Sequence, residues 1–137
     1  MEIIATDTPN LKNVTNMSGS FSNVTKNVFN NIDKWDVSNV TNMALMFDAA
    51  ISFNQPLNDW NVSNVTDMSG MFNKATSFNQ PLNNWNVSNV TNMSYMFNDA
   101  KSFDQNISMW DVSNVTDHND FATGCPIDGK DKMPNFQ

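Results

Sequence analysis

The sequence predicts an α/β fold, a solenoid in which short helices and short parallel strands recur with a 25-residue period. The first observation is the spacing of the four tryptophans, Trp35, Trp60, Trp85 and Trp110, whose numbers differ by 25 each time. The second is the motif that follows each of them: Asp or Asn, then Val-Ser-Asn-Val-Thr, then Asn or Asp. Chains that repeat at roughly 20–50 residues form stacked arrays, because each unit buries its apolar side against its neighbours.

The third observation is a change of apolar spacing within a unit. One segment has helical spacing and predicts a short helix over about 90–99, with Ser88 or Asn89 as its N-cap; its apolar positions are Val90, Met93, Met96, Phe97 and Ala100. A helix of two turns is unstable alone and needs packing of its apolar face.

The segment before each tryptophan has no helical spacing. It is rich in Asn, and Pro81 disfavours a helix, so we expect a very short strand around Leu82–Trp85. Strands of successive units would pair in parallel about 4.8 Å apart.

Polar residues recur as regularly as apolar ones. Asn, Gln and Ser side chains can donate and accept, so identical residues in register predict ladders that bond to one another and to turn backbone. The expected ladders are Asn39, Asn64, Asn89 and Asn114; Ser38, Ser63, Ser88 and Ser113; and Gln55, Gln80 and Gln105.

The repeat divides the chain into three parts. Residues 1–34 form a degenerate N-terminal repeat or cap, because the motif from Asn13 to Phe21 matches later units imperfectly. The 25-residue solenoid repeats occupy 35–117, with a fourth unit that begins at Trp110 and breaks off after Asp117. Residues 118–137 are expected to be a C-terminal cap and tail, since His118 replaces a repeated Met and the rest is rich in Gly, Pro, Lys and Asp.

Composition excludes several partners. The net charge of −7, with only seven Lys plus Arg, argues against nucleic acid or an anionic membrane as a ligand. No apolar run reaches the ~18 residues of a membrane span, and the N-terminus lacks the features of a signal peptide. The single cysteine, Cys125, cannot form an internal disulfide.

The repeat unit resembles that of the BspA-like leucine-rich-repeat surface proteins of bacteria. Three units carry the full pattern, from Trp and Val-Ser-Asn-Val-Thr through Met-Phe to Ser-Phe and Gln-Pro-Leu or a variant of it; they are residues 35–59, 60–84 and 85–109. The resemblance implies a right-handed leucine-rich-repeat-like solenoid. It also implies an extracellular or cell-surface location, often in lipoproteins or wall-anchored proteins that adhere to host or matrix proteins.

Catalytic chemistry has little support. His118 has only Asp117 and Asp120 beside it, and we interpret it as a polar exit from the core. Cys125 lies in a Gly-Cys-Pro turn without a recognisable base. We therefore expect a non-enzymatic protein without cofactor or resident metal.

Carboxylates in the units mostly exchange with Asn at matching positions, which indicates that an acceptor oxygen is needed while charge is optional; the residues are Asp36, Asp59, Asp67, Asp104, Asp111 and Asp117. Weak calcium binding is the alternative to solvated turn residues, although no compact carboxylate loop is present. The Met and Phe positions could form a soft binding groove, but their spacing favours core. They are Met43, Met46, Met68, Met71, Met93, Met96, Phe47, Phe72 and Phe97.

A binding surface is expected where the units differ, because positions free of stacking can specialise. The candidate partner-binding residues are Asp59, Asn84, Met109, Leu45, Tyr95, Lys74 and Lys101. The predicted function is an adhesion or protein-binding module, or a spacer within a larger adhesin. The alternative is an ice- or glycan-binding array through Thr41, Thr66, Thr91 and Thr116.

Overall fold

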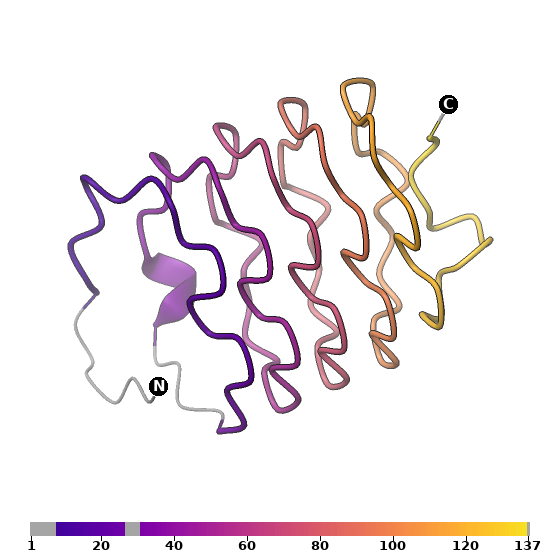
Figure 1. Ribbon diagram of the computed structural model, residues 1–137, viewed down its shortest axis with the longest axis horizontal. Helices are drawn as coiled ribbons and strands as arrows, with labels where there is room; N and C mark the ends of the chain where they lie inside the picture. The colour runs from indigo at the N-terminus through magenta and orange to yellow at the C-terminus, as the bar shows by residue number, and fades with distance from the viewer. Residues whose placement is uncertain (1–7, 27–30, 137) are drawn as a thin grey trace.

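In the computed structural model, which describes residues 8–26 and 31–136, the chain runs as a stack of similar coils along one axis (Figure 1). The remainder of the predicted first unit, residues 1–7 and 27–30, and residue 137 lie outside the described residues. Each coil turns its repeated Val, Met, Phe, Leu and Trp inward, and these side chains form one continuous core. No polar side chain of the described residues is buried in that core.

The predicted α/β class, with strands on one face and helices on the other, is wrong, and with it the leucine-rich-repeat-like architecture. In the described part of the chain the only helix is η1, a 3-10 helix at Ile32–Lys34. Parallel pairing there is limited to isolated bridges between neighbouring coils, which join Asn16, Asn42, Asp67, Asn92 and Asp117 in that order. The coils consist almost entirely of turns.

The predicted helix over 90–99 is a succession of tight turns. The amide of Met96 donates to Met93 O at 3.3 Å, and that of Asn98 to Tyr95 O at 3.2 Å. The amides of Tyr95 and Phe97, which alternate with these, donate instead to the next coil. In an α-helix every amide donates to the carbonyl four residues earlier in the same segment. Apolar residues spaced three or four apart are buried equally well by consecutive turns, so spacing alone misled the prediction.

The predicted strand around Leu82–Trp85 is also a turn, closed by the Trp85 amide donating to Leu82 O at 3.2 Å. The same bond joins Trp60 to Leu57. Asp59, Asn84 and Met109 therefore lie in a turn before each tryptophan and not on a strand face. The Asn-rich composition that weakened a helical reading favours turns just as strongly.

Aromatic columns run through the core. Phe72 stacks on Phe47 at a centroid distance of 5.6 Å and on Phe97 at 5.4 Å. A second column stacks Phe78 on Phe53 at 5.7 Å and on Phe103 at 5.9 Å. Such stacked pairs add about 0.5–1.5 kcal/mol each beyond the burial of their area.

Each interior tryptophan ties its coil to the one before. The indole N–H of Trp60 donates to Ile32 O at 2.8 Å, that of Trp85 to Leu57 O at 2.8 Å, and that of Trp110 to Leu82 O at 3.0 Å. These bonds satisfy a buried donor that would otherwise cost about 1–3 kcal/mol.

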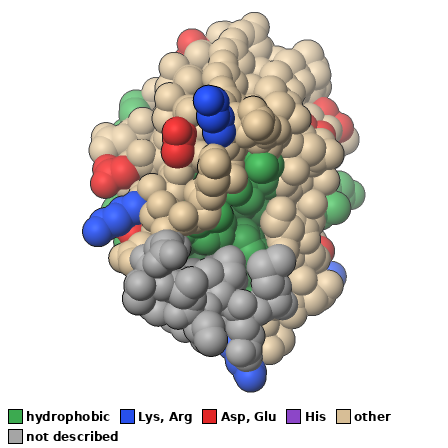
Figure 2. Space-filling model, turned by 90° about the vertical axis from the view of Figure 1, so that its left-hand side faces the viewer, with side chains coloured by type: hydrophobic (Ala, Val, Ile, Leu, Met, Phe, Trp, Pro, Cys, Tyr) green, Lys and Arg blue, Asp and Glu red, His purple; other side chains and the backbone are tan. Residues whose placement is uncertain are grey.

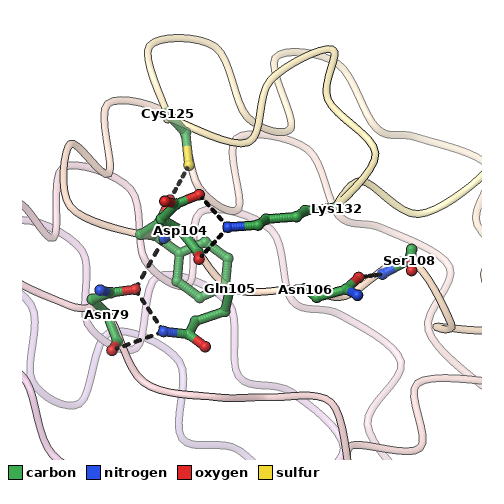
Figure 3. Close-up of polar contacts among 8 residues, drawn as sticks. Asn79, Asp104, Gln105, Asn106, Ser108, Cys125 and Lys132 are labelled. Carbon is green, nitrogen blue, oxygen red and sulfur yellow. Dashed lines mark hydrogen bonds and ion pairs between the residues drawn. The ribbon is translucent and has the colours of Figure 1, made fainter.

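The expected bonds of the Asn row to turn backbone are present, whereas the expected bonds between identical residues of the Asn39 and Gln55 rows are not observed among the described residues. The Asn64 side chain donates to Ser38 O at 2.7 Å, and Asn89 and Asn114 repeat this contact one coil further on each time. The Gln105 side chain donates to Asn79 Oδ1 at 2.9 Å (Figure 3). The side-chain amides thus bond to the preceding coil, those of the Asn row to backbone carbonyls and that of Gln105 to the Asn79 side chain.

The C-terminal residues continue the stack as a fifth coil. Ile107 N donates to Lys132 O at 3.0 Å, and Lys132 Nζ lies 2.9 Å from Asp104 Oδ1 (Figure 3). Phe136 stacks on His118 at a centroid distance of 4.3 Å and meets Phe121 edge-on at 4.9 Å. An aromatic ring therefore lies beside the fifth coil's core much as each tryptophan does in the coils before it.

Candidate functional site

Two rows of residues, each row holding one residue from every coil, have left-handed backbone. The row of Leu45 has φ between 54° and 63° and comprises Gly19, Leu45, Gly70, Tyr95 and Asp120. The row of Ala49 has φ between 55° and 78° and comprises Asn23, Ala49, Lys74, Asp99 and Gly124. Three of the predicted binding residues, Leu45, Tyr95 and Lys74, lie in these two rows.

The left-handed backbone follows from how the coils bond to one another. Leu45 N donates to Ser69 O at 2.8 Å, Lys74 N to Asn98 O at 2.8 Å and Tyr95 N to Asn119 O at 2.9 Å. Each of these residues stands third in a tight turn, the position that takes positive φ in a type II turn and usually holds Gly or Asn. A side chain there costs about 1–2 kcal/mol, and the ladder bonds hold it in place.

Leu45 and Tyr95 present large apolar side chains to solvent from this strained row, with exposed fractions of 46% and 47%. Between them lies Gly70. A Cβ atom on Gly70 would come within 2.5 Å of Leu45 Cδ2, so the Leu45 side chain leans across the glycine. In three successive coils this position holds Leu45, Gly70 and Tyr95, so the glycine leaves room for the Leu45 side chain.

Charged side chains accompany this apolar pair. Lys74 is exposed in the adjacent left-handed row, and Lys101 Nζ lies 3.2 Å from Asp99 Oδ1 in an exposed ion pair. We call Leu45, Gly70, Tyr95, Lys74, Asp99 and Lys101 the variable ridge.

The other predicted residues form a separate group. Asp59, Asn84 and Met109 are exposed, Met109 to 55%, and occupy the turn before each tryptophan. Among the described residues no hydrogen bond or ion pair joins these side chains to the variable ridge. The seven predicted residues therefore fall into two groups, four in the variable ridge and three in the turns before the tryptophans.

The expected need for an acceptor oxygen is confirmed at the positions of Asp36 and Asp67, where Asp and Asn exchange. Asp36 Oδ1 accepts from Ser38 N at 3.1 Å, and Asn61 Oδ1 accepts from Ser63 N at the same distance one coil later. Hydrogen bonds from the hydroxyl and amide of Ser38 lower the pKa of Asp36, and those of Ser113 lower the pKa of Asp111. An amide or a carboxylate can close this turn.

Groups of three His, Cys, Asp or Glu arranged to hold a metal do not occur among residues 8–26 and 31–136. His118 is exposed and covered on one side by Phe136. The buried Cys125 thiol donates to Phe103 O at 3.3 Å, and burial raises its pKa to about 11. At neutral pH it is a protonated thiol and a poor nucleophile.

The threonine row is exposed and regular. Thr66 Oγ1 donates to Thr41 O at 3.3 Å, and Thr91 Oγ1 donates to Thr66 O at 3.2 Å. Thr116 repeats the contact with Thr91 at 3.2 Å. The hydroxyl proton of each threonine is therefore used within the stack, while its oxygen can still accept a hydrogen bond.

Sequence reasoning missed the left-handed rows. A signal was present: glycine occupies the Leu45 row at Gly19 and Gly70, and the Ala49 row at Gly124. These glycines are scattered over different coils, so only alignment by coil shows that they share two positions.

A family model described as "Mycoplasma protein of unknown function, DUF285" matches residues 6–131. No curated protein and no solved structure matches the chain. In the described residues, no helix has the length and apolar character that crossing a bilayer requires.

Proposed function

Since this chain belongs to the family described as Mycoplasma protein of unknown function, DUF285, we propose a function from its surface: a non-enzymatic protein-binding module of the cell surface. It acts as an adhesion unit, or as a spacer that carries one within a larger protein. Its ligand is a protein, either a host or matrix protein or another surface protein.

The observation that carries this proposal is the pair Leu45 and Tyr95. Both are large and apolar, both are about half exposed, and both occupy backbone that favours glycine. Strained residues that the surrounding structure holds in place concentrate at functional sites. Tyrosine is also among the residue types that dominate binding energy at protein interfaces.

Two further features support the proposal. Positions that repeat unchanged lie in the core or in the ladders, whereas four residues of the variable ridge are exposed: Leu45, Tyr95, Lys74 and Lys101. The resemblance of the repeat to BspA-like surface proteins supports the location. The coils offer an extended surface of the kind that repeat proteins use for recognition.

Binding to immobilised matrix proteins and to intact host cells tests the proposal. The double variant Leu45→Ser with Tyr95→Ser should lose binding by about tenfold or more, because each change removes an exposed apolar anchor. Met109→Ser is the matched control, since Met109 is 55% exposed and occupies the turn before Trp110, outside the variable ridge. Equal binding by the double variant and the wild type would refute the ridge as the binding surface.

A second candidate is an ice- or glycan-binding array through Thr41, Thr66, Thr91 and Thr116. The observation in its favour is that these threonines are exposed in register, alongside the row of Asn39, Asn64, Asn89 and Asn114. Thermal hysteresis of the protein and of Thr66→Val with Thr91→Val tests it. Thermal hysteresis equal to that of buffer would rule out ice binding. Binding to a glycan array would test the glycan alternative.

A further inference from the structure

The two ends of the stack present complementary rows of backbone groups. Inside the stack, each coil donates four alternate amides to four carbonyls of the next coil. Met43 N donates to Asp67 O at 2.9 Å, and Leu45, Phe47 and Ala49 continue the row at 2.8–2.9 Å. All these bonds run in the same direction along the stack, so the first and last coils differ in what they leave unpaired.

The last coil ends with donors. The amides of His118, Asp120, Ala122 and Gly124 stand at the donor positions of the row and have no hydrogen-bond partner among the described residues. The first coil ends with acceptors. The carbonyls of Asn16, Ser18, Ser20 and Ser22 stand at the acceptor positions and likewise have no partner among residues 8–26 and 31–136.

The backbone of the two ends also matches. Asp120 and Gly124 have φ of 54° and 78°, and Gly19 and Asn23 have φ of 63° and 64°, the same left-handed turns found in every coil between them. A last coil and a first coil placed in contact would therefore repeat the geometry that already joins each coil to the next.

Trp35 provides a second and independent observation. Its indole nitrogen is buried without a partner, and the side chain is only 5% exposed. Every later tryptophan donates to the coil before it, as Trp60 does to Ile32 O. In the last coil the residue equivalent to Ile32 is Lys132, which lies 25 residues after Ile107 and accepts a hydrogen bond from Ile107 N.

The end that carries Trp35 is also apolar at its centre. Figure 2 shows this end, with hydrophobic side chains in a hollow surrounded by other atoms. The charges of the two ends differ. Among the described residues the first coil holds Lys12, Lys26 and Lys34 against Asp33, whereas the last holds Asp111, Asp117, Asp120, Asp128 and Asp131 against Lys130 and Lys132. An apolar, hydrogen-bonding end with unpaired backbone is a template for another chain.

We propose that the occupant of this end is a second copy of the same chain, stacked head to tail. The amides of His118, Asp120, Ala122 and Gly124 in one copy donate to the carbonyls of Asn16, Ser18, Ser20 and Ser22 in the next. The contact is heterologous, so each addition leaves a new free end and the assembly grows as a line of copies.

Sedimentation velocity of the full chain at rising protein concentration tests the assembly. We expect the average mass to rise with concentration and to fall with added salt, because the charges of the two ends attract. A mass equal to that of the monomer at every concentration would overturn the proposal.

A matched pair of variants locates the contact. Ser18 would face Asn119 of the neighbouring copy, between Asp117 and Asp120, so Ser18→Glu places like charges together. We expect it to raise the dissociation constant by about tenfold or more. Ser77→Glu adds the same charge at an exposed position inside the stack and should leave assembly unchanged. If both variants weakened assembly equally, net charge would be the cause and the end-to-end contact would be refuted.

A mixing experiment distinguishes head-to-tail stacking from a symmetric dimer. Ser18→Glu blocks the first coil by its charge, and Asn119→Trp blocks the last coil by its bulk, since Asn119 is exposed. Each variant keeps one native end and should be monomeric alone. Their mixture should form one-to-one dimers and nothing longer. Unchanged circular dichroism and melting temperature confirm that both variants are folded. A mixture that stays monomeric, or variants that dimerise alone, would contradict the proposal.

Discussion

The Leu45 side chain lies across Gly70 of the next coil, where an added Cβ would come within 2.5 Å of Leu45 Cδ2. Gly70 also has φ of 60°. The glycine thus serves two purposes, since it adopts the left-handed turn without strain and leaves space for its neighbour's side chain.

Gly70→Ala should therefore destabilise the protein by about 1–2 kcal/mol, chiefly through the left-handed backbone. Gly19→Ala is the matched control, because Gly19 has φ of 63° and no atom within 4 Å of the added Cβ. The difference between the two losses, measured by urea unfolding, should be only about 0.5 kcal/mol, since the half-exposed Leu45 side chain can turn into solvent. A loss several times that of Gly19→Ala would mean that Leu45 cannot move.

Trp35→Phe and Trp60→Phe should differ in their effect on stability. Both changes shrink a buried ring, but only Trp60→Phe breaks an existing hydrogen bond, the 2.8 Å contact with Ile32 O. Trp35→Phe removes a donor that is already unpaired. We expect Trp60→Phe to cost about 1–2 kcal/mol more, measured by denaturant unfolding at a protein concentration too low for assembly. Equal losses would show that Trp35 is paired in solution.

Asp36 and Asp111 should make stability depend on acid. Hydrogen bonds from Ser38 and Ser113 lower the pKa of these carboxyls in the folded protein from an unfolded value of 3.8. A lowered folded pKa stabilises the protein above pH 3.8, and this contribution is lost as pH falls through the folded pKa.

The double variant Asp36→Asn with Asp111→Asn should flatten this acid loss, measured by melting temperature against pH. Its turns should still close, because Asn61 and Asn86 accept from Ser63 and Ser88 in the coils between. An unchanged acid slope would show that other carboxyls dominate it.

Cys125 should react with thiol reagents only after unfolding. The Cys125 thiol is buried, donates to Phe103 O and has its pKa raised to about 11 by burial. At pH 8 it is protonated and shielded, so labelling monitored by mass spectrometry should be slow in buffer and fast in urea. The raised pKa also means that stability falls as pH rises above the pKa of an unfolded thiol, about 8.5. Rapid labelling of the folded protein would contradict the buried position.

The acceptor role of the exchanging Asp and Asn residues could be predicted because the exchange itself reveals it. A carboxylate and an amide share one feature, an oxygen two bonds from Cβ, and Asp36 and Asn61 use that oxygen alike. The burial of the tryptophans and phenylalanines could also be predicted, because they recur at fixed intervals. The left-handed rows that hold Leu45, Tyr95 and Lys74 could not, because the sequence shows which positions vary and not their backbone conformation.

The sequence by itself determined the 25-residue interval, the residues that fill the core and the polar positions that need an acceptor. It did so because each property depends on a residue's chemical type and its recurrence. The tertiary structure alone decided that the coils are made of turns and not of helices and strands. Apolar residues three or four apart are buried by either arrangement, and the choice depends on where alternate amides find acceptors. In this protein the amides of Leu45 and Tyr95 donate to carbonyls of the next coil. This pairing goes with the left-handed backbone of their row, and it leaves unpaired backbone groups at both ends of the stack.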